Sequence, residues 1–452
     1  MEYGYSPYTI VLLLAVGLPL GVLNPWRCFL LSTLLLLAGN EDHFIFTRLP
    51  WLGPFANLND VCVFLALWAV FFDWLRRRTI PRFPAPFLAA MAVILIGFIQ
   101  TGMKVGWTYE TLRGFRWALA FPLAYFIAAN FHWDRERVRQ FILVLFAGCF
   151  LAGFQHLLMV VRIGPLAQHG FARTISFLAS NVPQSILVMA AIWSLPQDLK
   201  RRMLYILALS VMTLSTILSL TRSVWLATIC TIPFAFLYYR LSNRLNIAFR
   251  LILVGILAMV IAIIMFQVFF PEINLADMIL ERFLSLTQGL ESESSNRGRM
   301  FALKVEMQYW LESNWIFGQG LMFYQTIAVP RSDTANYVAF GHLGYITYLS
   351  QFGVAGLLVL GLYIPLSTIR KSRIIWQEAA HPEFRYLAGL SGINITFLAI
   401  VFAMSSSLLG LGYHVSGLLC GSVWILHRKL ARGEIEKISD QDPKSAKTAN
   451  PE

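Results

Sequence analysis

The feature that most constrains this chain is a series of continuous apolar runs that recurs from one end of the sequence to the other. A helix of roughly 17 to 25 residues is long enough to cross a hydrocarbon core about 30 Å thick, and most of the runs have this length. Only helices and closed barrels satisfy every backbone polar group in lipid, and these runs do not alternate as barrel strands do. The sequence therefore predicts an all-α, polytopic transmembrane helix bundle.

The composition agrees with this class, because 57% of the residues are hydrophobic and only 13% are charged. Soluble domains carry about 25% charged residues. The run at 28–39 is short for a span, so about 12 spans are predicted from the runs. The first run lacks a basic n-region and a small-residue cleavage site, and we interpret it as a retained helix. The runs lie at 8–23, 28–39, 59–75, 85–102, 113–131, 140–161, 176–195, 203–220, 223–240, 250–270, 343–368, 385–404 and 408–427.

Basic clusters between the runs predict the orientation of the chain. Two spanning runs separate each cluster from the next, so all the clusters fall on one side, which the positive-inside rule assigns to the cytoplasm. This rule explains most of the net charge of +12 without a nucleic-acid partner. The clusters are Arg76–Arg78 with Arg82, Arg135–Arg139, Lys200–Arg202, Arg240–Arg250, Arg370–Arg373 and His427–Arg432.

Four regions follow from this topology. Residues 1–270 hold the N-terminal transmembrane helices, 271–341 form one large periplasmic loop, 342–430 hold the C-terminal transmembrane helices, and 431–452 form a disordered cytoplasmic tail. Within the loop, apolar residues spaced three or four apart from Met300 to Leu311 predict an amphipathic helix that Gly318 and Gly320 end. The five cysteines form no CxxC pair, so neither a disulfide framework nor a zinc site is predicted.

Several arginines lie on the side where the positive-inside rule does not expect them. Charged residues at membrane boundaries or at depth are costly, and arginine binds phosphate oxygens in pairs through its planar fork. This grouping favours a polyanionic ligand on the outer side, whereas snorkelling or pairing with a carboxylate is the alternative for each residue. Arg162 and Arg331 are better explained by the alternative, and Arg282 has Glu281 beside it. The residues favoured for ligand binding are Arg113, Arg116, Arg173, Arg222, Arg282, Arg297 and Arg299.

One histidine, His342, lies where the large loop re-enters the membrane. A histidine can take a proton from a hydroxyl near neutral pH, and the alternative is an interface histidine bonded to a backbone carbonyl. His156 and His169 have weaker contexts. No second ligand is spaced to make a metal site with His342, so neither a metal nor another cofactor is predicted.

Four fragments in order, from 221 to 356, carry a resemblance. They are Thr221-Arg-Ser-Val-Trp225, Glu281-Arg-Phe-Leu-Ser-Leu286, Arg299 followed by Trp310 and Phe317-Gly-Gln-Gly320, and His342-Leu-Gly-Tyr-Ile-Thr-Tyr-Leu-Ser-Gln-Phe-Gly-Val-Ala-Gly356. Together they resemble the O-antigen ligase and O-antigen polymerase family of bacterial envelope glycosyltransferases. Arg173 and the residues after it are similar to a further family stretch. The family has asparagine where this chain has Leu343, and proline where it has Trp315.

The resemblance implies a fold of the GT-C type and a metal-independent, inverting glycosyltransferase of the inner membrane that works on the periplasmic side. It implies an undecaprenyl-diphosphate-linked glycan as donor, and lipid A-core or a growing glycan as acceptor. His342, Arg222 and Arg299 are then the expected catalytic residues. The arginines favoured above, Arg222 and Arg299 included, would hold the diphosphate.

Three other functions remain open at this point. A polymerase would join repeat units on the same carrier, whereas a ligase would move a finished chain to lipid A-core. A solute transporter should place ionisable residues in the middle of several spans, but here the charges gather at the outer boundary. A structural scaffold would leave the outer arginines unexplained.

Overall fold

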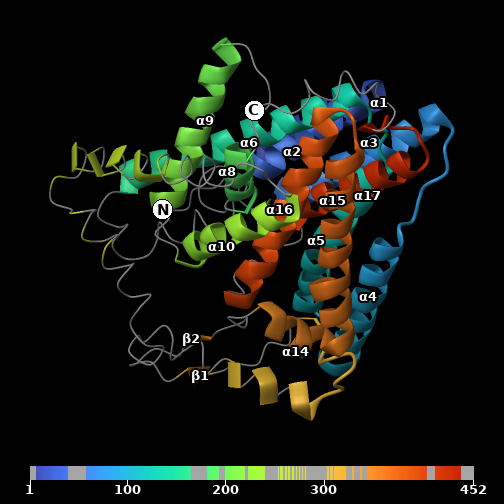
Figure 1. Cartoon of the computed structure of the whole chain (residues 1–452). Coiled ribbons are helices and arrows are strands. Elements are labelled where there is room, and N and C mark those ends of the chain that lie inside the picture. Colours follow the sequence, from blue (N-terminus) through green and yellow to red (C-terminus); the bar gives the residue numbers. More distant parts are fainter. Residues whose placement is uncertain are drawn as a thin grey trace.

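A computed structural model of the chain shows a predominantly helical protein (Figure 1). It describes residues 7–38, 58–163, 181–192, 199–218, 222–239, scattered positions in 253–280, most of 303–321, 328–329, 336–337, 344–404 and 413–438. Two short strands, β1 (Ala328–Val329) and β2 (Asn336–Tyr337), form an antiparallel pair. The helices are α1 (Pro7–Leu23), α2 (Pro25–Ala38), α3 (Leu58–Arg77), α4 (Ala85–Val105), α5 (Tyr109–Asn130), α6 (Arg135–Ile163), α8 (Asn181–Ile192), α9 (Leu199–Leu218), α10 (Arg222–Tyr239), α14 (Gly344–Gly356), the π-helix η3 (Leu357–Tyr363), α15 (Ile364–Glu378), α16 (Pro382–Met404) and α17 (Tyr413–Ala431).

Four of the described helical segments are long and apolar enough to cross a membrane. They confirm a helical membrane protein, while the count of about 12 spans and the side of the large loop stay predictions. The segments are Ala85–Lys104, Arg135–Leu158, Gly344–Glu378 and Pro382–Ala403.

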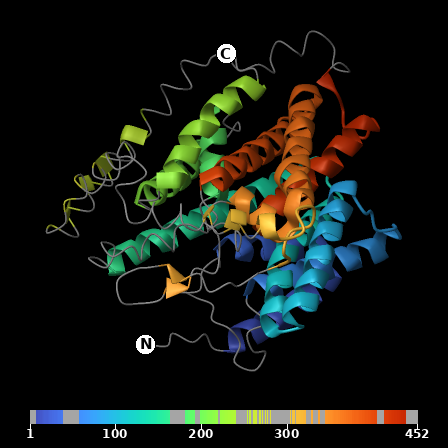
Figure 2. The ribbon, with the colours of Figure 1, turned by 90° about the horizontal axis from the view of Figure 1, so that it is seen from below.

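The helices run in two main directions. Figure 1 shows α4, α5 and the rod of α14, η3 and α15 side by side, whereas α6 and α10 lie across them. Figure 2, seen from below, shows α4 and α5 nearly end-on and α6 still lying lengthwise. The bundle is therefore layered rather than a set of parallel rods.

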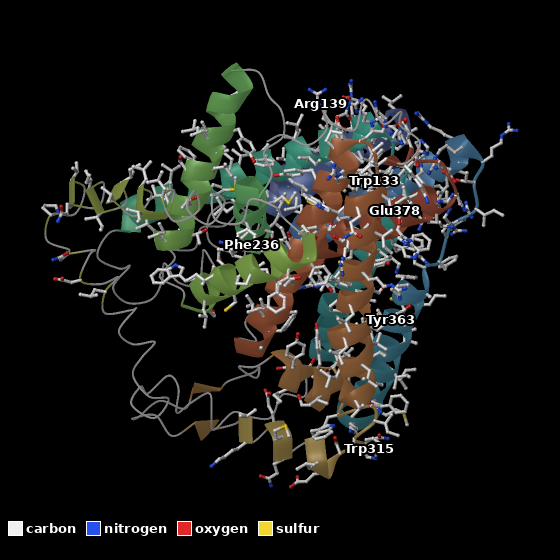
Figure 3. All side chains as sticks on the ribbon, viewed as in Figure 1. Trp133, Arg139, Phe236, Trp315, Tyr363 and Glu378 are labelled. Carbon is white, nitrogen blue, oxygen red and sulfur yellow. The ribbon has the colours of Figure 1, made fainter. Side chains whose placement is uncertain are left out.

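Basic clusters that are distant in sequence meet at one end of the helices α4, α5 and α15. Burial, and then the like charges of Arg428 and Arg432, lower the pKa of Arg82. Burial, and then Lys429 and Arg137, lower the pKa of His132 in the same way. We call this end, where the clusters near 76–82, 132–139, 370–378 and 427–437 lie, the basic end. Figure 3 shows Trp133, Arg139 and Glu378 toward this end and Trp315 at the opposite end, with Tyr363 between them.

Packing near the basic end combines aromatic rings with short residues. Phe29 is fully buried, and its ring centroid lies 4.5 Å from that of Phe131 and 5.7 Å from that of Phe141. Farther along α17, Gly417 and Gly421 lie directly against the backbone of α5. Small residues at this spacing let two membrane helices approach closely, so α5 and α17 form a tightly packed pair.

The chain just beyond α17, which the sequence assigns to the predicted disordered tail from residue 431, packs back onto the helices as far as residue 438. The chain turns back after α17, and the Ala380 amide donates to the Glu436 carbonyl over 3.0 Å. Ile435 is buried, and Lys437 lies 3.3 Å from the Glu378 carboxylate. One apolar anchor, this backbone bond and this ion pair hold residues 432–438, which composition alone does not indicate. Residues 439–452 lie outside the described residues.

Candidate active site

The structure describes some of the predicted site residues in full, some by their backbone alone and others not at all. Arg116 is described in full, whereas only the backbone is described for Arg113 in α5 and for Arg222 at the first residue of α10. Whether these residues converge on a common ligand therefore stays a prediction. The remaining ones lie outside the described residues: Arg173, Arg282, Arg297, Arg299 and His342.

The tryptophan three residues after Arg222 links α10 to the end of α9. Helix α9 ends at Leu218 and α10 begins at Arg222. The Trp225 indole donates a hydrogen bond of 3.0 Å to the Thr216 carbonyl, one of the last carbonyls of α9. These carbonyls have no partner within their own helix, so an indole from the next helix satisfies one of them. The Trp225 side chain thus ties the first turn of α10, which begins at Arg222, to the end of α9.

Polar side chains of α6 and α8 contact the last residues of α9. The His156 Nδ1 atom of α6 lies 2.8 Å from the Ser215 hydroxyl of α9, and the Gln184 amide of α8 donates to the Thr216 hydroxyl over 2.8 Å. His156 is buried, so the structure gives it a packing role among helices. The sequence did not predict these hydrogen bonds between helices. Each bond joins single polar residues of two apolar runs, and neither run shows which other run it packs against.

The prediction that the Gly-x-Gly segment ends the loop helix is wrong, because the helical residues stop before it. Helical residues of this part of the loop continue to Glu312, and a turn follows, in which the Gly318 amide donates to the Asn314 carbonyl over 2.6 Å. The backbone of Gly318 has φ +69° and that of Gly320 has φ +109°. Glycine adopts such angles without steric cost, so the two glycines shape a segment beyond the helix rather than its last turn.

The ends of α3, α4 and α5 opposite the basic end gather further charges. Arg116 of α5 lies 3.1 Å from the Asp60 carboxylate of α3. Lys104, near the end of α4, is exposed, and its ammonium donates to the Gln319 carbonyl over 3.2 Å. A phosphate bound at Arg116 would share this guanidinium with Asp60. Lys104 is a cation that the sequence interpretation missed, although its place at the end of an apolar run was the available signal.

An apolar cavity lies between α4, α5, the rod of α14 and α15, and α16. Leu321 and Phe352 line it near the Gly-x-Gly segment, and Ile364 and Pro365 line it farther toward the basic end. The wall also includes Gln351 and two tyrosines, of which Tyr345 donates its hydroxyl to the Ala399 carbonyl. Such a lining suits an apolar chain with few polar groups.

The apolar helices and the crossing packing define a multi-pass helical membrane protein. Within this class, residues 206–361 match the O-antigen ligase family model, Wzy_C. The match covers about a third of the chain and supports an O-antigen ligase or polymerase type of membrane glycosyltransferase. It confirms the family resemblance, and it includes Arg222, Arg282, Arg297, Arg299 and His342. No individually curated protein matches the chain.

Proposed function

We propose that the protein transfers a glycan from an undecaprenyl-diphosphate carrier to an acceptor hydroxyl at the periplasmic face of the inner membrane. The specific proposal is an O-antigen ligase that attaches O-antigen to lipid A-core. The observation that carries it is the family match over 206–361, because this segment contains Arg222, Arg299 and His342.

Two structural features support this proposal. The bond from the Trp225 indole to the Thr216 carbonyl ties the start of α10 to the end of α9. An apolar cavity reaches from Leu321 to Pro365, and an isoprenoid chain has the chemistry that its wall favours. A lipid donor needs both a cationic head-group site and an apolar path, and the chain offers residues for each.

The proposed reaction is a direct displacement at the anomeric carbon. His342 takes the proton of the acceptor hydroxyl, and the oxygen attacks from the face opposite the diphosphate, so the configuration inverts. The bond from the anomeric carbon to the phosphate oxygen breaks, and undecaprenyl diphosphate leaves with the electron pair. Arg222 and Arg299 stabilise the added negative charge, with contributions from Arg173, Arg113, Arg116, Arg297 and Arg282.

A transfer assay tests this proposal with purified protein in nanodiscs, a carrier-linked glycan as donor and lipid A-core as acceptor. Arg222→Ala should lower the rate on the order of 10²–10³-fold, because a donor to the developing charge is lost. Arg139→Ala is the matched control, since Arg139 is exposed at the basic end and its loss removes the same charge. Full activity of Arg222→Ala would remove this residue from the mechanism.

Further arms of the same assay separate the alternatives. Extension of a carrier-linked repeat, with no product on lipid A-core, would identify a polymerase instead of a ligase. Uptake of a small solute into liposomes without glycan transfer would identify a transporter. Transfer that persists in chelator is the expected result for metal-independent chemistry.

A further inference from the structure

The helix that follows His342 in the sequence is interrupted about one turn before its π-helical segment. Gly353 in α14 has φ 64° and ψ −162°, which are not helical values. A helix interior would bond the amides of Val354 and Ala355 to the carbonyls of Ser350 and Gln351. The break at Gly353 separates these two amides from these two carbonyls. In lipid each of the four groups must find another partner.

Residues 315–320, which include the Gly-x-Gly segment, supply all four partners. The amides of Gln319 and Gly320 donate to the carbonyls of Ser350 and Gln351 over 2.8 and 2.9 Å. In the other direction, the Val354 amide donates to the Trp315 carbonyl over 3.0 Å, and the Ala355 amide donates to the Ile316 carbonyl over 2.9 Å. We call this contact of 315–320 with 350–355 the interlock. Neither segment satisfies its backbone without the other.

Glycines are required on both sides of the interlock. A Cβ atom on Gly353 would lie 2.3 Å from the carbonyl carbon and oxygen of Ile316. A Cβ atom on Gly318 would lie 2.6 Å from the Gln351 carbonyl carbon and from the Gly353 amide nitrogen. These neighbours are backbone atoms, so no side-chain rotation relieves the clash. Positive φ angles at both glycines add a second reason why other residues do not fit.

Helix α4 also contacts the interlock, at the residue that follows Gly320. The buried Thr101 hydroxyl oxygen lies 3.0 Å from the Leu321 carbonyl oxygen and 2.8 Å from the Gly97 carbonyl oxygen, and the Leu321 amide donates to the Gly97 carbonyl over 3.3 Å. A Cβ atom on Gly320 would lie 2.4 Å from the Thr101 hydroxyl oxygen. The interlock is therefore fixed to one of the membrane-spanning helices and is not a contact within the loop alone.

We propose that the interlock is the positioning element of the reaction centre. Arg299 precedes the interlock segment at Trp315 by 16 residues in the sequence, and His342 lies just before α14. One backbone contact thus ties together the two chain segments that lead from these residues and anchors both to α4. This inference rests on the proposed function. It assigns Gly318, Gly353 and Thr101 a positioning role, without contact to the substrate.

Two variants and their controls test this role in nanodiscs by amide hydrogen exchange and transfer kinetics. Gly353→Ala should expose the amides of Gln319, Gly320, Val354 and Ala355 and lower kcat on the order of 10²-fold, the effect of misplacing reacting groups by about 1 Å. Gly433→Ala is the matched control, because Gly433 has φ +71° and no neighbour within 4 Å of an added Cβ atom.

Thr101→Val keeps the side-chain shape and removes only the hydroxyl, so it addresses positioning even if Gly353→Ala fails to fold. It should lower kcat at unchanged KM for the donor and speed exchange at Leu321, and Thr101→Ser should restore both. Exposed interlock amides with wild-type kcat would overturn the positioning role. Rapid exchange of these amides in the wild-type protein would show that the interlock does not exist. No transfer by the wild-type protein would overturn the proposed function and this role with it, while exchange would still report on the contact.

Discussion

Replacing Gly421 by alanine should force α5 and α17 apart. A Cβ atom at this position would lie 2.2 Å from the Tyr125 carbonyl oxygen and 3.0 Å from the Ala128 Cβ atom. Ordinary van der Waals contact begins at 3.4 Å, so the added methyl group is about 1 Å too close to a backbone oxygen. Because the obstacle is backbone, the helices must separate or bend.

The cost follows from overpacking and from helix propensity. Overpacking of a closely fitted interface costs about 1–3 kcal/mol, and a backbone clash places Gly421→Ala at the upper end of this range. Alanine favours a helix over glycine by about 1 kcal/mol, which offsets part of this cost. We therefore expect Gly421→Ala to lower the free energy of unfolding by about 2 kcal/mol.

The measurement is an SDS unfolding titration in mixed micelles, followed by far-ultraviolet circular dichroism. Gly255→Ala is the matched control, because Gly255 is helical and an added Cβ atom there would have no neighbour within 4 Å. The control should be unchanged or more stable by up to about 1 kcal/mol. Equal stabilities of the two variants would refute the view that close backbone approach holds this helix pair together.

Three further predictions concern the aromatic core, a helix connection and the loop. Phe29→Ala should lower the free energy of unfolding by about 3–5 kcal/mol, because it empties a fully buried ring site; thermal denaturation measures this, with Phe29→Leu as the milder control. Lys429→Met should cost about 1–3 kcal/mol, because it removes the donor to the buried Trp133 carbonyl over 2.7 Å; Lys429→Arg should retain more stability in the same assay. Burial raises the pKa of Glu306 from 4.5 to about 7, so the folded state binds more protons than the unfolded state between these values. The free energy of unfolding should therefore fall as pH rises from about 4.5 to about 7. Glu306→Gln should remove this pH dependence from the profile of melting temperature against pH.

The positions of the helices were predictable from the sequence because an apolar run and its end signals are local. The predicted run at 85–102 corresponds to α4, which begins after Pro84 and ends before Gly106 with φ +91°. The run at 385–404 corresponds to α16, which begins at Pro382. Hydrophobic length sets the existence of such a helix, and proline or glycine sets its ends.

The contacts between helices were harder to predict, because each depends on residues far apart in the chain. Arg116 was assigned to phosphate binding from its side of the membrane alone, and the structure places the Asp60 carboxylate beside it. Counting spans predicts on which side of the membrane a charged residue lies. The residues beside it depend on which helices pack together, and span counting does not predict that. Gly417 and Gly421 did carry a local signal, since glycines four apart in an apolar helix are typical of close packing.

The interlock explains why the prediction for Gly318 and Gly320 was wrong, although the two glycines do mark an unusual backbone conformation. Gly318 and Gly320 were expected to stop a helix, which is the commonest role of glycine after an amphipathic segment. Their positive φ angles serve instead a pairing with carbonyls more than thirty residues later, and the partner break at Gly353 lies inside an apolar run. Leu321, Gln351 and Phe352 also line the apolar cavity, so the interlock forms part of its wall. A shift of this contact should therefore also change the wall of the cavity, so the apolar path of the proposed reaction depends on a backbone contact that no single local pattern reveals.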